Sequence, residues 1–191
     1  MRIELEKTAR LFSSASLIGP GQKEDMMKSI VVFYSLEGNC KLIGETIAEA
    51  AGSDILELKL KKPIPHKGPL KFVSGGRSAL QKKSPELAVS IPDLSDYDLI
   101  FAGAPVWAGT FAPALRTFAK KAQLQGKTLC LFTCCAGGPT EKCLMGMKNL
   151  FKGNAVLSEI QFVNPTSKNR EACIQKAVDW VQQLPLHLIP S

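Results

Sequence analysis

A run of strand-forming residues, a polar turn and a helical pattern follow one another without a gap near the start of this chain. Residues 30–34 (IVVFY) favour a strand, and the turn after them is Ser35-Leu36-Glu37-Gly38-Asn39-Cys40. From Leu42 to Ala51, apolar residues recur at the spacing of one helix face. A helix that begins after such a turn presents unpaired backbone N–H groups and the positive end of its dipole. The sequence therefore predicts a phosphate site at this turn.

Strand and helix patterns alternate through the rest of the chain. Strands are predicted at 30–34, 54–60, 97–103, 127–133 and 155–163, and helices at about 39–52, 113–123, 140–151 and 169–184. Residues 61–96 are broken by prolines and are predicted as a long irregular excursion, with room for one short helix at 72–83. Such alternation is typical of a parallel sheet covered by helices on both faces. We expect an α/β fold, a three-layer doubly wound sandwich with a five-stranded parallel sheet.

Turns rich in small residues follow three of the predicted strands. They are residues 35–40, 104–110 and 134–139. In a parallel sheet of this kind, ligands bind beyond the carboxyl ends of the strands, at the point where the strand order reverses. We therefore expect the three turns to converge on one rim and to form a single site.

The chain divides into a core and two ends. Residues 28–184 are expected to form one domain, with a tail at 185–191 and an accessory or disordered extension at 1–27. The extension does not match a secretory signal, because acidic residues stand at its start and serines dilute its apolar part. No apolar run approaches the roughly 20 residues of a membrane span, so no membrane partner is expected.

The net charge of +7 is unevenly distributed. Residues 59–83 carry eight cationic side chains and no acidic one. Such a surface attracts acidic partners or anionic ligands, although a solvated basic loop without a partner explains the pattern equally well. A nucleic-acid partner is not predicted, because no recognised motif or interleaved aromatic residues accompany the lysines.

The six cysteines do not predict disulfides or a metal site. No C-x-x-C pair is present, histidines number only two, and a domain of this size does not need covalent links for stability. Reduced thiols in a cytoplasmic protein are the expectation. Cys40 is not expected to be a phosphatase nucleophile, because that chemistry needs an arginine where this chain has Thr46.

Two of the turns carry motifs of a known family. Ser35 to Cys40 resembles the phosphate loop of the flavodoxins, whose pattern is Ser/Thr-x-Thr-Gly-Asn-Thr, and Pro105-Val106-Trp107-Ala108-Gly109-Thr110 resembles their second flavin loop. Cys134, Cys135, Gly137 and Gly138 match the third loop by position and by the two glycines. The resemblance covers residues 28–184. It implies the strand order 2-1-3-4-5, bound FMN and redox chemistry.

The three turns could together supply what FMN requires. Backbone N–H groups of the first turn, the Ser35 hydroxyl and the Asn39 amide can satisfy a phosphate. Trp107 offers a flat stacking partner for the flavin ring, although a tryptophan here could also be ordinary core packing. Small residues near 108–110 and 136–138 leave backbone groups accessible to the ring edge. Cys134 and Cys135 are read as small residues in a tight turn, and no catalytic residue or metal ligand is predicted.

Three departures from the flavodoxin pattern bear on this site. Glu37 stands where the pattern has threonine, so its backbone N–H and not its carboxylate is expected to face the phosphate. Cys40 replaces the last hydroxyl residue, and a thiol is a poor donor. The third turn has no aromatic residue to cover the second face of the flavin.

The sequence favours the first of three functions. The first is an FMN-bound electron-transfer protein, whose partner would be an acidic protein or a small-molecule electron donor or acceptor. The second is an NAD(P)H- or quinone-dependent FMN oxidoreductase with an open flavin face. The third is an interaction module that has lost FMN, which the intact glycines and Trp107 disfavour. The oligomeric state is not predicted.

Overall fold

Strands and helices alternate in the structure as the sequence predicts. The structure is a computed structural model, and it describes residues 27–63, 84–167 and 169–185. Its elements are β1 (Ser29–Tyr34), α2 (Asn39–Ala51), β2 (Asp54–Leu58), β3 (Leu99–Trp107), β4 (Thr110–Phe111), α4 (Pro113–Ala122), β5 (Thr128–Cys135), α5 (Glu141–Leu150), β6 (Ala155–Val163) and α6 (Arg170–Gln182). The main sheet has the order β2-β1-β3-β5-β6, and all of its neighbouring strands are parallel. Without β4, this order is 2-1-3-4-5 along the chain, which confirms the predicted fold.

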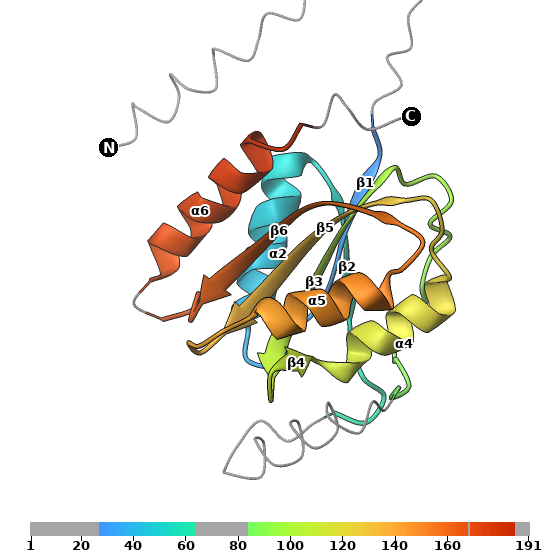
Figure 1. Ribbon diagram of the computed structural model, residues 1–191, viewed down its shortest axis with the longest axis horizontal. Helices are drawn as coiled ribbons and strands as arrows, with labels where there is room; N and C mark the ends of the chain where they lie inside the picture. Colours follow the sequence, from blue (N-terminus) through green and yellow to red (C-terminus); the bar gives the residue numbers. More distant parts are fainter. Residues whose placement is uncertain (1–26, 64–83, 168, 186–191) are drawn as a thin grey trace, which may run out of the picture.

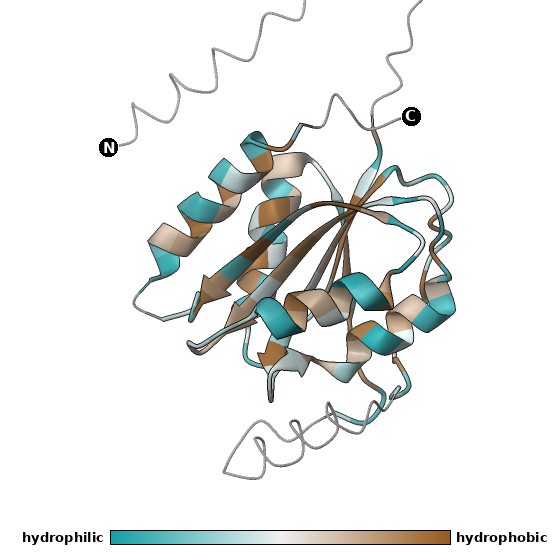
Figure 2. Cartoon of the chain, in the orientation of Figure 1, coloured by the Kyte–Doolittle hydropathy of each residue, from teal (hydrophilic) through white to brown (hydrophobic). Residues whose placement is uncertain are grey.

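Helices cover both faces of the sheet (Figure 1). Helices α2 and α6 pack on one face, where Phe33 and Phe132 are buried, and α4 and α5 pack on the other, where Ile100 and Leu131 are buried. Figure 2 shows apolar strands between helices whose polar residues face outward. Strand β1 is buried along its whole length, as expected for a parallel strand with helices on both sides.

Two strands are longer than the sequence analysis predicted. The predicted turn at 104–110 begins inside β3, which continues to Trp107 and forms a hairpin with β4. Ala108 and Gly109 both have positive φ angles, 48° and 74°, which suit the two-residue turn of such a hairpin. Strand β5 continues to Cys135, so both cysteines of the predicted third turn lie in a strand. The small residues suggested turns, but pairing with a neighbouring strand overrides that local preference.

The second predicted strand is shorter than expected, because β2 ends at Leu58. Leu60 instead forms an isolated antiparallel bridge with Leu87, far along the chain. The predicted short helix at 72–83, most of the extension and the tail after residue 185 lie outside the described residues. Within the described ranges, no helix is long and apolar enough to cross a membrane.

Candidate functional site

A pocket of about 360 Å³ lies beyond the carboxyl ends of β1, β3 and β5. Nine predicted site residues line it: Leu36, Glu37, Asn39, Pro105, Val106, Trp107, Ala108, Cys134 and Cys135. Ala136 and Asn164 complete the lining. The three segments that follow these strands therefore converge, as the parallel topology requires. The other predicted site residues, which do not line this pocket, are Ser35, Gly38, Cys40, Gly109, Thr110, Gly137 and Gly138.

The first turn has the geometry of an anion-binding loop. Gly38 precedes α2 with a φ of 87°, a left-handed conformation that favours glycine. No side chain caps the helix and no acidic residue stands in its first turn. The first N–H groups of an α-helix have no partner inside the helix. The N–H groups at the start of α2 are therefore suited to an external acceptor.

Among the described residues, a buried hydroxyl at the first position of this loop has no hydrogen-bond partner. The Oγ atom of Ser35 is buried, and no partner for it is found in the described part of the chain. A buried polar atom without a partner is costly, by about 1–3 kcal/mol. Ser35 also lines a second hollow, of about 350 Å³, toward the end of β2, and Leu36 lines both spaces. The loop thus offers a donor that a bound phosphate would satisfy.

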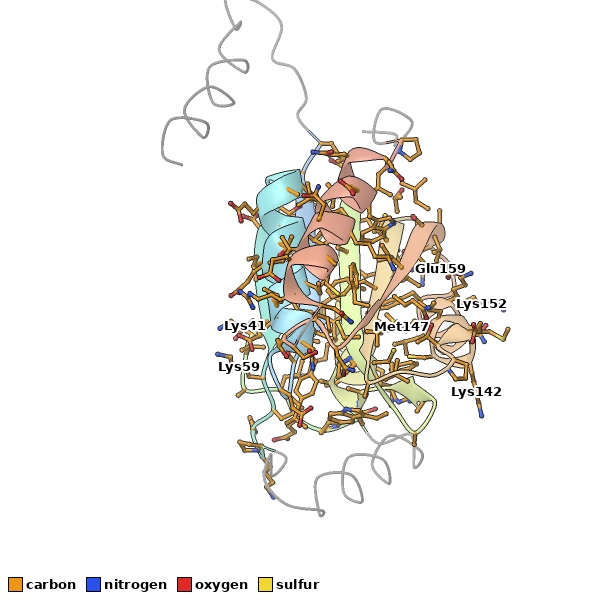
Figure 3. The ribbon with its side chains drawn as sticks, turned by 90° about the vertical axis from the view of Figure 1, so that its left-hand side faces the viewer. Lys41, Lys59, Lys142, Met147, Lys152 and Glu159 are labelled. Atoms are coloured by element: carbon orange, nitrogen blue, oxygen red, sulfur yellow. The ribbon has the colours of Figure 1, made fainter. Side chains whose placement is uncertain are left out.

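Two lysines near the loop, Lys41 and Lys59, do not line the pocket. Lys41, in the first turn of α2, lies 3.7 Å from Glu45 on an exposed surface, and Lys59 lies 3.6 Å from Glu57. Figure 3 shows both lysines at the outer edge of the molecule on the β2 and α2 side, with Lys142 on the opposite side. An anion in the pocket would therefore be held by N–H and O–H donors, although Lys59 lines the second hollow beside Ser35.

Trp107, at the end of β3, is held in place by an aromatic contact with Tyr34. Its ring lies 5.7 Å from that of Tyr34, and the two rings are nearly perpendicular, at 88°. Such edge-to-face pairs are favourable beyond their buried area. Trp107 is only partly buried, and it lines the pocket. It therefore combines core packing against Tyr34 with a surface that a planar ligand can stack on.

The two tyrosines of the chain, Tyr34 and Tyr97, are expected to resist ionisation in the native protein. Burial raises the pKa of Tyr34 to about 12. The hydroxyl of Tyr97 donates a 2.6 Å hydrogen bond to Asp54, and this bond raises the pKa of Tyr97 to about 12. In an unfolded chain, the tyrosine side chain has a pKa of about 10. The native state therefore binds more protons above that pH, and its stability is expected to fall as the pH rises from about 10 to 12.

Tyrosinate absorbance measures this shift directly. Native protein is expected to ionise its tyrosines well above the pH at which the same chain ionises in denaturant. A native titration with a midpoint near that of the unfolded chain would contradict the buried position of Tyr34 and the Tyr97–Asp54 hydrogen bond.

The loop after β6 contributes a residue that the sequence analysis missed. Asn164 lines the pocket, and its backbone N–H donates a 2.9 Å hydrogen bond to the carbonyl of Cys135. Its φ of 46° is left-handed, which asparagine tolerates better than most residues. A signal was available, because the rule that brings the ends of β1, β3 and β5 to one rim applies equally to the end of β6.

Comparison with known families supports what the fold and the pocket indicate. The family model described as Flavodoxin matches residues 28–184, which is most of the chain. The chain belongs to the flavodoxin family. Its pocket occupies the place where this fold binds ligands, beyond the carboxyl ends of the strands.

Solved structures share the fold of this flavodoxin at low sequence identity. A flavoprotein from Lactobacillus acidophilus NCFM, solved in complex with FMN, is 21% identical with a TM-score of 0.64, and the match covers 76% of this chain and 99% of that one. A putative flavoprotein from Bacteroides uniformis is 19% identical with a TM-score of 0.67, covering 82% and 99%. At these identities, the likeness establishes the fold.

Curated relatives match a smaller part of the chain. An NAD(P)H dehydrogenase (quinone) from Caulobacter vibrioides is 31% identical over 93 residues, which is 49% of this chain and 45% of the relative. The protein of the same name from Sinorhizobium fredii is 28% identical over 131 residues, 64% of each chain. The flavodoxin thus spans about half the length of the first of these relatives.

The structure explains one departure from the flavodoxin phosphate loop. The side chain of Cys40 is fully buried in the core between the sheet and α2, so it does not face the loop. The sequence predicts that one phosphate hydrogen bond is lost or weakened at this position, and the buried side chain leaves only the backbone of Cys40 to serve the loop. The neighbouring Cys40 thiol, together with burial, holds the pKa of Cys134 well above its usual range. Cys134 is therefore a protonated thiol and not a nucleophile at neutral pH.

Within the described part of the chain, residues 136–139 of the third segment are not covered by other residues. Ala136 to Pro139 are all exposed, and a Cβ at Gly137 or Gly138 would meet no heavy atom within 4 Å. Both glycines have positive φ angles, 119° and 94°. Since no aromatic side chain stands between Cys134 and Thr140, a planar ligand on Trp107 would be approachable from this side.

Proposed function

We propose that this flavodoxin binds FMN in the pocket and transfers electrons through it. The observation that carries the proposal is the buried Oγ of Ser35, which has no hydrogen-bond partner among the described residues and lies at the first position of the loop before helix α2. Trp107 lines the pocket that the same loop borders. Hydrogen-bond donors for a phosphate and an aromatic stacking surface thus lie close together. FMN requires both, because it carries a phosphate at one end and a flavin ring at the other.

Each part of the chain has a defined task in this proposal. The N–H groups at the start of α2, the Ser35 hydroxyl and the Asn39 amide would hold the phosphate. Trp107, supported by Tyr34, would orient the ring and exclude water from one of its faces. Bound FMN would supply the redox chemistry, accepting and donating electrons. Since the chain carries a net charge of +7, its redox partner would be an acidic protein or an anionic small molecule.

A second candidate is an oxidoreductase that uses NAD(P)H or a quinone. The exposed, small third segment favours it, because a second substrate could reach the flavin there. The curated relatives named NAD(P)H dehydrogenase (quinone) point the same way, although the chain matches only part of their length. An FMN-free interaction module is the remaining alternative.

Flavin absorbance separates these functions. Purified chain with added FMN is expected to perturb the flavin spectrum and to retain the flavin through gel filtration. Protein that binds no FMN would leave only the interaction module. If FMN binds, an anaerobic titration with NAD(P)H and a soluble quinone follows. Steady turnover would establish the oxidoreductase, whereas reduction without turnover, with oxidation by a partner protein, would establish the carrier.

Replacing Trp107 by alanine is expected to weaken FMN binding by about 1–2 kcal/mol, because the aromatic stacking surface is lost. The control is Trp107→Phe, which keeps an aromatic ring and is expected to retain most of the affinity. Quenching of flavin fluorescence measures the Kd of each variant. An alanine variant with wild-type affinity would remove Trp107 from the site.

A further inference from the structure

Asn39 and Thr166 lie 127 positions apart and form a pair of hydrogen bonds at the edge of the pocket. The backbone N–H of Thr166 donates to Oδ1 of Asn39 at 3.1 Å, and the Thr166 hydroxyl donates to the same oxygen at 2.9 Å. A backbone N–H can only donate, so the atom that faces it is the oxygen of the amide. Both lone pairs of that oxygen are engaged. The Nδ2 group, with its two donors, is therefore on the opposite side of the amide.

The loop that carries Thr166 is tied to another wall of the pocket. Asn164 donates from its backbone to the carbonyl of Cys135 at 2.9 Å, and its side chain donates to the carbonyl of Ala136 at 3.3 Å. Thr166 also lies beside the phosphate loop, since its Cγ2 would be 3.8 Å from a Cβ at Gly38. The loop after β6 thus joins the end of β5 to the start of α2.

We propose that Thr166 is a positioning residue that holds the Asn39 amide with its NH₂ group toward the phosphate of the ligand. This rests on the proposed binding of FMN. The phosphate depends on this donor more than the family pattern suggests, because Cys40 is turned into the core and Glu37 replaces a hydroxyl residue. The pair Asn39–Thr166 would therefore select flavins that carry a phosphate over riboflavin, which has the same ring but no phosphate.

The substitution Thr166→Val tests the proposal, because valine has the shape of threonine without its hydroxyl. The variant is expected to bind FMN roughly fivefold more weakly, the effect of one lost hydrogen bond, with its riboflavin affinity unchanged. Thr166→Ser keeps the hydroxyl and is expected to restore FMN binding. The readout is the Kd for each flavin, measured by fluorescence quenching.

A matched control and a double-mutant cycle separate orientation from stability. Thr46→Val removes a hydroxyl on α2 that donates to the carbonyl of Leu42 in the same helix, and it is expected to leave both affinities unchanged. In an Asn39→Ala background, Thr166→Val is expected to have no further effect on FMN binding, because its action passes through Asn39.

The outcomes distinguish the two proposals. A wild-type protein that binds neither flavin would overturn the proposed function, and the inference with it. Wild-type binding of FMN that Thr166→Val leaves unchanged, or a loss of riboflavin and FMN affinity to the same extent, would overturn the inference alone.

Discussion

Replacing Gly103 by alanine is expected to destabilise the protein by about 3 kcal/mol. Gly103 lies in β3, opposite Phe132 of β5, and the fully buried ring of Phe132 covers it. A Cβ at this position would be 2.0 Å from the Cζ atom of that ring. Because Phe132 is enclosed by the core, the ring cannot move away without displacing its neighbours. Urea unfolding at equilibrium measures the loss.

The control for this variant is Gly146→Ala in α5. There an added Cβ would be 3.3 Å from the ring of Phe111, which would need to shift by only a few tenths of an ångström. Alanine is also a better helix former than glycine, by up to about 1 kcal/mol, so the net effect is expected to be small. In the double variant Gly103→Ala with Phe132→Leu, the cost is expected to be less than the sum of the single changes. Equal stabilities of the wild type and Gly103→Ala would contradict the packing described.

Gly38→Ala is expected to weaken FMN binding roughly 30-fold, or by about 2 kcal/mol. At a φ of 87°, alanine is strained, whereas glycine is not. The loop can relieve the strain only by leaving the conformation in which its N–H groups converge on the phosphate. FMN binding would then require the strained form, and its affinity would fall by the cost of that form. Fluorescence quenching by the protein gives the Kd.

Gly52→Ala provides a matched control at the other end of the same helix. Gly52 caps α2 with a φ of 62°, and a Cβ there would meet no atom within 4 Å. Its replacement is expected to cost about 1 kcal/mol of stability through backbone strain alone, with no change in FMN affinity. If both variants bound FMN equally well, the role of the Gly38 conformation in phosphate binding would be disproved.

The order of elements could be predicted from the sequence because it depends on local patterns, and the place of the candidate pocket followed from that order. The apolar run at 30–34 predicts strand β1, and Gly38 with the residues after it predicts the start of α2. The segments that follow β1, β3 and β5 converge because these strands are parallel. The strand order itself came from the resemblance to the flavodoxins.

Tertiary structure alone decided which atoms meet within that framework. The burial of Cys40 against Cys134, the extension of β3 through Pro105 to Trp107 and the bonds of Thr166 to Asn39 all join residues distant in the chain or depend on a partner strand. No local propensity encodes such contacts, because the direction of a side chain depends on what packs against it. The sequence predicts a phosphate site at the first turn, and the packing of distant segments determines which groups of that turn remain available to a ligand.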